Sequence, residues 1–344
     1  MTEEFFYNAL NVFHGSNYNA LRKSRACFAT WEEAWNALNA REAHLPDPEK
    51  EWARAASLGI KLFLLGQPEY PAALEEIPHP PFGIYCLGDI PKTVDKTITL
   101  AIVGTRRATP EGKELAKSIS RDLAARKIII FSGLALGIDA AAHTGCIEAG
   151  GKTIAIVGNG LDTLYPRTNE KLAMKILETG GTIISEYPPG TPALPYRFLE
   201  RNRIVSGLAR GALVIEAPER SGSLATARFA LEQNRDVFVV PGPVAHPNFK
   251  GSHQLIRAGA ELVTCASDIL HAFGMESEVE NSGAKEFSNE EEKQIFECLR
   301  KSSEPFTIDK LAEMTNLDTT AVQRAVTFLI IKNYIKETDN GYTI

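Results

Sequence analysis

The sequence predicts an α/β protein built on an extended Rossmann-like, doubly wound, mainly parallel sheet, flanked by a small N-terminal helical domain and a C-terminal winged helix. Between residues 98 and 264, short runs rich in Ile and Val alternate with helical segments. These runs are apolar at successive positions, which is typical of strands buried on both faces of a parallel sheet. At 344 residues the chain exceeds the size of about 250–300 residues at which single cores stop growing, so we expect several domains.

The first 65 residues are expected to form the small helical domain, of the SAM or helix-hairpin-helix kind. Apolar residues recur there at helical spacing, with an interruption at Pro46 and Pro48. Residues 66–95 are rich in proline and indicate an extended connector with one short strand at 82–87. We place the Rossmann domain at residues 66–273.

The alternating part of the chain gives the strands and helices of that domain. Predicted strands cover 99–103, 127–131, 153–157, 182–184, 212–216, 237–240 and 261–263. Predicted helices cover 110–126, 138–149, 168–179, 199–209, 222–234 and 252–259. Thr109 before Pro110 suits a helix start, and Gly150 before Gly151 suits a helix end. Ligands of a doubly wound sheet bind beyond the carboxyl ends of its strands, so the loops there are the candidate site.

The C-terminal quarter of the chain differs in composition. Residues 274–288 are polar and acidic and predict a linker. Within 289–344, helical stretches at 290–300, 307–314 and 319–333 precede a hairpin signal at Asn340-Gly341. Three helices followed by a short β-ribbon indicate a winged helix.

Charge and cysteine content limit the classes of function. The net charge of −6 argues against a globally basic nucleic-acid binder, but residues 276–344 alone carry that excess, with 14 Asp and Glu against 8 Lys and Arg. Residues 196–257 hold nine Lys and Arg against five Asp and Glu, which favours a local basic surface. The five cysteines are scattered without a C-x-x-C pair, no long apolar run is present, and the first residues lack a basic leader pattern. We therefore expect a reduced cytoplasmic protein without disulfides, zinc or a membrane span.

Two glycine turns follow neighbouring predicted strands. Gly104-Thr105-Arg106-Arg107 lies between a strand and a helix start, an arrangement that binds phosphate through free N–H groups. It lacks the later glycines of a dinucleotide fingerprint and the Lys of a Walker A loop. Gly133 and Gly137 flank the next turn, where they let the backbone approach a ligand.

An arginine pair carries the most specific signal. Arg201-Asn202-Arg203 follows Phe198, and near a helix start we expect both arginines to reach one groove rim. Cations interleaved with aromatic rings suit single-stranded nucleic acid, because arginines pair with phosphates and rings stack on bases. A solvated helix start with Phe198 in the core is the alternative that the pattern leaves open.

The remaining polar residues predict no catalytic or metal site. Ser221-Gly222-Ser223 opens a helix and lacks the elbow of a catalytic serine. His143 is expected to be a packed helix residue rather than a base. His246 and His253 are not expected to bind a metal, and no cofactor is indicated.

Several of these motifs together resemble the DprA/Smf family. The resemblance rests on the runs Ser132–His143, Gly151-Lys152-Thr153, Tyr165-Pro166, Ser185–Gly190, Arg201-Asn202-Arg203, Ser221–Leu224 and Val240–Pro243. It implies a protein of natural transformation that binds single-stranded DNA, forms a homodimer and helps to load the RecA recombinase, without catalytic activity.

The resemblance also implies which residues contact DNA. The family's Gly-Ser/Thr-Arg motif falls on Gly104-Thr105-Arg106, and its basic and aromatic groups fall on Arg197, Phe198, Arg201 and Arg203. Leu136 departs from the pattern, because many members carry an arginine there that can pair with phosphate. The expected DNA-binding residues are Gly104, Thr105, Arg106, Arg107, Gly133, Gly137, Arg197, Phe198, Arg201, Asn202, Arg203, Ser221, Gly222, Ser223 and Lys250.

Two other interpretations stay open. A pocket of Gly, Ser and Thr on this fold would suit a nucleotide-binding enzyme similar to nucleoside-monophosphate phosphoribohydrolases, although Pro241-Gly242-Pro243 lacks their glycine-rich loop. Alternatively the winged helix is the main duplex binder. Its predicted recognition helix carries only Arg324 and Lys332 as cations, which favours contact with a protein instead.

Overall fold

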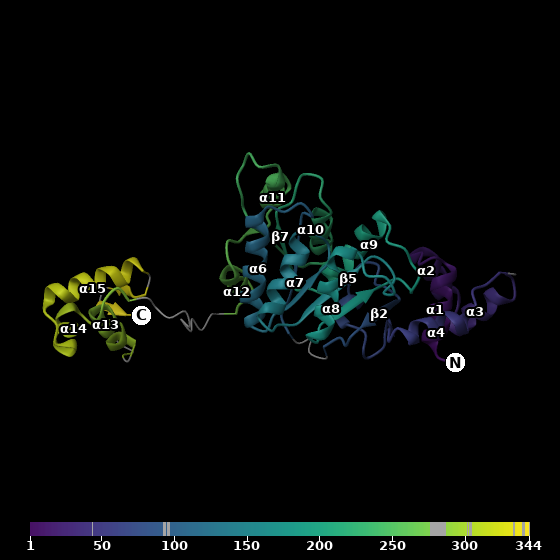
Figure 1. The fold of residues 1–344 in the computed structure, drawn as a ribbon, viewed down its shortest axis with the longest axis horizontal. Helices are drawn as coiled ribbons and strands as arrows, with labels where there is room; N and C mark the ends of the chain where they lie inside the picture. The colour runs from purple at the N-terminus through teal and green to yellow at the C-terminus, as the bar shows by residue number, and fades with distance from the viewer. Residues whose placement is uncertain are drawn as a thin grey trace. The chain divides into compact units, whose positions relative to one another are not determined.

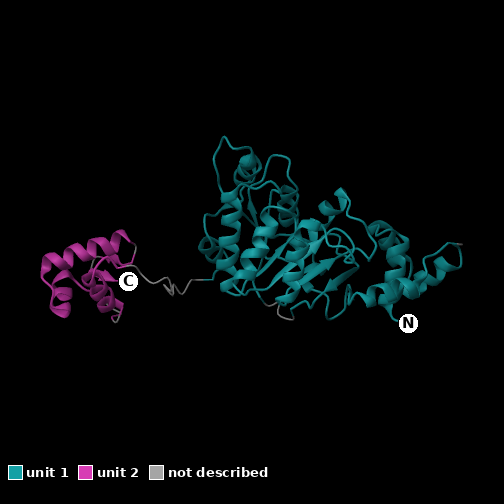
Figure 2. Ribbon diagram, in the orientation of Figure 1, with its two compact units in different colours: residues 1–276 teal, residues 277–344 magenta. Residues whose placement is uncertain are grey.

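The computed structural model describes residues 1–42, 44–91, 94, 97–275, 287–300, 302, 305–332, 334–338 and 341–343. The chain forms two compact units, residues 1–276 and 277–344 (Figure 2). Most of the predicted linker at 274–288 lies outside the described residues, as does Asn340 of the predicted hairpin. Within the described ranges, every helix falls short of the length and apolarity that crossing a membrane requires.

One mixed sheet forms the centre of the first unit (Figure 1). Its described strands are β1 Lys61–Leu64, β2 Gly83–Leu87, β3 Thr99–Gly104, β4 Ile129–Ser132, β5 Thr153–Val157, β6 Thr182–Ser185, β7 Gly211–Ile215, β8 Asp236–Val239 and β9 Glu261–Leu262. They lie in the order β1-β2-β6-β5-β4-β3-β7-β8-β9. All pairs from β6 to β9 are parallel, whereas β2 pairs antiparallel with both β6 and β1. The predicted mainly parallel sheet is thus confirmed.

Helices cover both faces of this sheet. Their bounds are α5 Ala72–Glu75, α6 Pro110–Ala125, α7 Ile138–Glu148, α8 Glu170–Glu178, α9 Pro195–Gly207, α10 Gly222–Glu232, α11 Lys250–Arg257 and α12 Ala266–Ala272. Alternate residues of β3 serve opposite faces, since Leu100 packs with α6, α7 and α12, while Ala101 packs with α5, α9 and α10. The continuous apolar run of this strand therefore fills two cores.

The N-terminal segment forms four helices, α1 Glu3–Phe13, α2 Tyr18–Cys27, α3 Trp31–Asn39 and α4 Pro48–Ser57. Their apolar side chains share one buried cluster with residues of the sheet. This cluster includes Tyr7, Trp31 and Val157. The hydroxyl of Tyr85 donates to Asn8 Oδ1 at 2.9 Å in this interface. Residues 1–65 were expected to be helical, but β1 falls within them and adds a strand to the sheet.

The second unit has a core of its own. Its described elements are α13 Glu290–Arg300, α14 Ile308–Thr315, α15 Thr319–Ile331, β10 Lys336–Thr338 and β11 Gly341–Thr343. Thr307 caps α14 and Asp318 caps α15, each accepting a backbone N–H with its side-chain oxygen. The helices lie where the sequence predicts them, and the winged-helix interpretation stays a prediction.

Candidate nucleic-acid interface

The sheet reverses its strand order around β3, which has β4 on one side and β7 on the other. Chain segments that leave these three strands diverge, and a crevice at such a point is where doubly wound sheets bind ligands. A cleft of about 610 Å³ lies there. We call it the strand-end cleft, and its lining comprises Val103, Gly104, Thr105, Arg106, Arg107, Ala135, Asp139, Tyr165, Ala193, Pro195, Phe198, Leu199, Arg201, Asn202, Pro218, Arg220, Ser221, Gly222, Ser223 and Thr226.

Arginines dominate the charge of the strand-end cleft. Arg106, Arg107 and Arg220 are exposed on it, and the buried Arg201 lies against it. Among these described lining residues the carboxylate is Asp139. The cleft is therefore locally cationic although the whole chain carries a net charge of −6.

An aromatic surface lies beside these cations. The guanidinium carbon of Arg106 lies 5.3 Å from the centroid of the half-buried Phe198 ring. The ring of Tyr165, 42% exposed, lies 5.5 Å from Phe198 with an interplanar angle of 31°. Leu136 is equally exposed and borders a small adjoining pocket of about 50 Å³ with both rings. At Leu136, where the resemblance implies an arginine in many members, this chain thus has an apolar side chain beside the two rings.

Beneath this surface, Arg201 holds the loop that follows β4. Its Nη1 donates to the carbonyl oxygen of Gly133 at 2.9 Å, and the Gly133 N–H donates to Asp139 Oδ2 at 3.0 Å. Burial lowers the pKa of Arg201 to about 10, with Asp139 opposing that change and the charge of Arg106 adding to it. Burial likewise raises the pKa of Asp139, against the influence of Arg201 and of backbone N–H groups. Arg201 stays cationic at neutral pH, and part of its charge is balanced inside the protein.

The glycine at the start of α7 fixes how closely the β3 and β4 loops approach. Gly137 has a φ of +82°, a conformation that other residues rarely adopt. A Cβ atom at this position would lie 2.3 Å from the carbonyl oxygen of Thr105. Gly137 therefore supports the Arg106 turn from behind rather than lining the cleft.

The serine turn closes the third side of the cleft. Ser221 precedes α10 and its Oγ accepts from the Ser223 N–H at 3.3 Å, while the two hydroxyls lie 2.7 Å apart. Asn202 Nδ2 donates to the Gly222 carbonyl oxygen at 3.1 Å, which ties α9 to this turn. The predicted Ser221-Gly222-Ser223 segment thus lies in the same cleft as Arg106 and Phe198.

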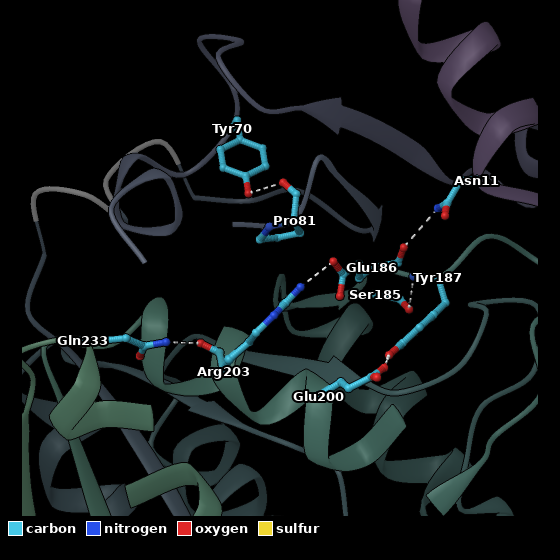
Figure 3. Close-up of polar contacts among 9 residues, drawn as sticks. All are labelled: Asn11, Tyr70, Pro81, Ser185, Glu186, Tyr187, Glu200, Arg203 and Gln233. Atoms are coloured by element: carbon cyan, nitrogen blue, oxygen red, sulfur yellow. Dashed lines mark hydrogen bonds and ion pairs between the residues drawn. The ribbon is translucent and has the colours of Figure 1, made fainter. Parts of the chain in front are cut away.

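The structure separates Arg203 and Arg197 from this cleft, so the expectation that Arg201 and Arg203 reach one rim is wrong. Arg203 Nη2 lies 2.6 Å from Glu186 Oε1, with side chains only 10% and 14% exposed (Figure 3). Arg197 Nη1 donates to the Pro192 carbonyl oxygen at 2.7 Å. Because α9 begins at Pro195 and not near 199, Arg201 and Arg203 both lie inside the helix, where residues two apart point about 200° away from each other.

Other residues also differ from the expected site. Lys250 is exposed at the start of α11 and is not part of the cleft lining. Arg220 and Tyr165 line the cleft but were not among the expected contacts. Arg220 could have been found, because it follows β7 by five residues in the same loop as Ser221. Tyr165 comes from the loop after β5, and its approach to Phe198 has no local sequence signal.

His143 is a packed residue, as predicted. It is fully buried on α7, and its Nδ1 lies 2.7 Å from Thr153 Oγ1. Burial lowers its pKa to about 3, so the ring is neutral at physiological pH. Within the described residues, no group of His, Cys, Asp and Glu is arranged to hold a metal ion.

Comparisons with known proteins identify the family of this chain. Residues 61–274 match the family described as DNA recombination-mediator protein A. The chain is 49% identical over 171 residues to Protein Smf of Escherichia coli (strain K12), a match that covers 50% of this chain and 46% of that protein. The chain spans about half the length of the Smf relatives that it matches.

Solved structures show the same fold. The X-ray structure of DNA processing protein A from Streptococcus pneumoniae has a TM-score of 0.60 and 32% sequence identity, and covers 78% of this chain and 93% of that chain. A second structure has a TM-score of 0.56 and 31% identity, and covers 62% of this chain and 95% of that chain. It is described as giving insights into the unique single-stranded DNA binding mode of DNA processing protein A from Helicobacter pylori.

Proposed function

The chain belongs to the family of DNA recombination-mediator protein A, and from this premise we propose that it binds single-stranded DNA in the strand-end cleft without catalysing a reaction. One observation carries the proposal: the Arg106 guanidinium lies over the Phe198 ring in a cleft whose lining has four arginines and one carboxylate. Such a surface offers phosphate contacts and a base-stacking face side by side.

The proposed strand follows the exposed arginines of the cleft. Arg106, Arg107 and Arg220 contact phosphates, and the rings of Phe198 and Tyr165 stack on bases. Arg201 lies below them and fixes the Gly133 loop, so its main role is positioning. Paired bases are already stacked inside a duplex, so aromatic stacking favours a single strand over a duplex.

The wider role follows from the relatives. The single-stranded DNA binding of the Helicobacter pylori protein supports this ligand here, because the two chains share the fold at 31% identity. We propose that the protein acts in the cytoplasm as a homodimer during DNA uptake, and that it passes the bound strand to the RecA recombinase.

The second unit suits a protein partner better than duplex DNA. The two cations of the predicted recognition helix are paired inside the unit, with Arg324 at 2.7 Å from Glu291 and Lys332 at 2.7 Å from Glu292. Phe328 and Ile331 are exposed on or at the end of the same helix α15. A helix with paired cations and exposed apolar side chains neutralises few phosphates.

A binding comparison tests the proposal. An oligothymidylate and a duplex of the same length are titrated with the full chain at two salt concentrations. We expect tighter binding of the single strand at both. Equal affinity for the duplex would contradict the assigned surface. In a parallel assay, release of a base from nucleoside monophosphates would show that the protein is a hydrolase and would contradict the proposal.

A further inference from the structure

A second cavity, of about 450 Å³, lies on the other face of α9. It is bounded by α9, by the loop after β6 and by the loop between α1 and α2. We call it the tyrosine pocket, defined by Tyr18, Glu186, Tyr187, Tyr196, Arg197 and Arg203. Its volume is within the range of small-molecule sites.

The charges of the tyrosine pocket compensate one another, because its lining holds Arg197 and Arg203 together with the carboxylates of Glu186 and Glu200. Arg203 pairs with Glu186, whose backbone carbonyl oxygen also accepts from Asn11 Nδ2 at 3.3 Å (Figure 3). The Arg197 guanidinium carbon lies 5.1 Å from the Tyr187 ring centroid and 5.5 Å from that of Tyr196. The tyrosine pocket therefore offers no excess positive charge for a phosphate, in contrast to the strand-end cleft.

Two polar atoms of this pocket lack partners. Arg203 Nη1 and Ser16 Oγ are buried and make no hydrogen bond. Ser16 belongs to the same lining, and the Arg203 residue is more than nine-tenths buried. Both atoms are closed off from solvent beneath the pocket wall, so a ligand contacts the aromatic rings and not these two atoms.

These features define the ligand. Aromatic side chains supply faces for a flat ring, and the balanced charges of the lining give no strong preference for an ion. We propose that the tyrosine pocket receives a nucleobase, stacked on Tyr196. Tyr196 is 51% exposed, so its ring is accessible.

The base comes from the strand bound in the strand-end cleft, and in this respect the inference rests on the proposed function. Tyr196 and Phe198 stand two residues apart in the first turn of α9, on opposite sides of the helix. A strand stacked on Phe198 reaches the tyrosine pocket by crossing that turn. A free nucleoside presents the same ring, so the experiment has an arm for each source.

An abasic scan tests the strand arm. A single abasic site is moved one position at a time along an oligothymidylate, and the affinity of the full chain is measured for each strand. Stacking contributes about 1–3 kcal/mol per base, so each stacked position should cost about 5- to 150-fold when abasic. We expect two sensitive positions in the wild type, one lost in Phe198→Ala and the other lost in Tyr196→Ala.

Two further variants distinguish the loss of the Tyr196 ring from the general effect of substituting an exposed side chain. Tyr196→Phe keeps the ring and should keep both sensitive positions. Met174→Ala removes an apolar side chain of similar exposure on α8 and should behave as the wild type. Thermal melts of all variants confirm that they are folded.

The outcomes distinguish this inference from the proposed function. If Tyr196→Ala keeps the wild-type affinity and both sensitive positions while Phe198→Ala does not, the cleft binds the strand and the tyrosine pocket takes no base from it. Equilibrium dialysis with free thymidine and deoxyadenosine then decides the other source. Binding that Tyr196→Ala abolishes assigns the pocket to a free nucleoside, and an absence of binding overturns the inference.

Discussion

Arg201 donates from Nη1 to the carbonyl oxygen of Gly133 at 2.9 Å and so joins α9 to the loop after β4. Gly133 also donates its N–H to Asp139. The two glycine contacts place a buried cation under the strand-end cleft without an ion pair of hydrogen-bonding length between the arginine and the carboxylate. These contacts fix the backbone beneath the cleft, and Asp139 balances part of the Arg201 charge there.

Gly133→Ala should damage this arrangement. The added Cβ would lie 2.5 Å from Arg201 Nη2 and 2.7 Å from Asp139 Oδ2, so one of these buried groups must move. We expect a loss of about 1–3 kcal/mol in the free energy of unfolding, measured by urea titration, and weaker single-strand binding. Gly222→Ala is the control, because nothing lies closer than 4.0 Å to its Cβ position. Equal stability of the two variants would show that the loop is not held as described.

Arg203→Ala should affect stability without changing phosphate contacts. Its removal leaves Glu186 largely buried without its partner, which typically costs about 3–5 kcal/mol. The salt dependence of strand binding should stay at the wild-type slope, because Arg203 lies outside the strand-end cleft. Arg107→Ala should do the reverse, with a shallower slope and stability changed by less than about 0.5 kcal/mol. A shallower salt slope for Arg203→Ala would show that Arg203 contacts phosphates of the bound strand.

Phe198→Ala should weaken single-strand binding through lost stacking. The expected loss is about 1–3 kcal/mol, with the salt slope unchanged because no phosphate contact is removed. Affinities at three salt concentrations measure both quantities. Phe198→Tyr keeps the ring over which Arg106 lies and should bind nearly as the wild type. Wild-type affinity of Phe198→Ala at all three salt concentrations would assign Phe198 to the core alone.

His143 should make the stability of the first unit depend on acid. Its folded pKa of about 3 is below the ordinary value of 6.5, so the unfolded chain takes up a proton below pH 6.5 that the folded chain does not. The free energy of unfolding should therefore fall as the pH falls from 6.5 towards 3, by up to about 1.4 kcal/mol per pH unit from this residue. His143→Gln removes this titrating group. The free energy of unfolding of the variant should therefore depend less steeply on pH, by up to about 1.4 kcal/mol per pH unit. An equal pH dependence of the wild type and of His143→Gln would mean that folding does not lower the pKa of His143.

Local signals predicted much of the fold. The Thr109 side chain accepts from the Gly112 N–H and Pro110 opens α6, as that pair of residues predicted. The strand β1 was missed because it depends on antiparallel pairing with β2, in which Leu62 pairs with Tyr85, and such pairing leaves little trace in the strand's own residues.

The candidate site depended on one helix boundary. Pro195 is the first residue of α9 and is a signal that the prediction did not use, although proline favours that position. With the boundary at Pro195, the opposite directions of Arg201 and Arg203 follow from helix geometry. The approach of Tyr165 to Phe198 could not be predicted, because it joins segments from different strands through tertiary packing.

The most direct test of the central claim is the salt dependence of oligothymidylate binding by the wild type and by Arg106→Ala. Each phosphate contact on a single strand contributes about 0.7 to the slope of log affinity against log salt. The account predicts that Arg106→Ala lowers the slope by about that amount, whereas Arg121→Ala, an exposed arginine on α6 outside the cleft, does not. An unchanged slope for Arg106→Ala would contradict the strand-end cleft as the path of the strand.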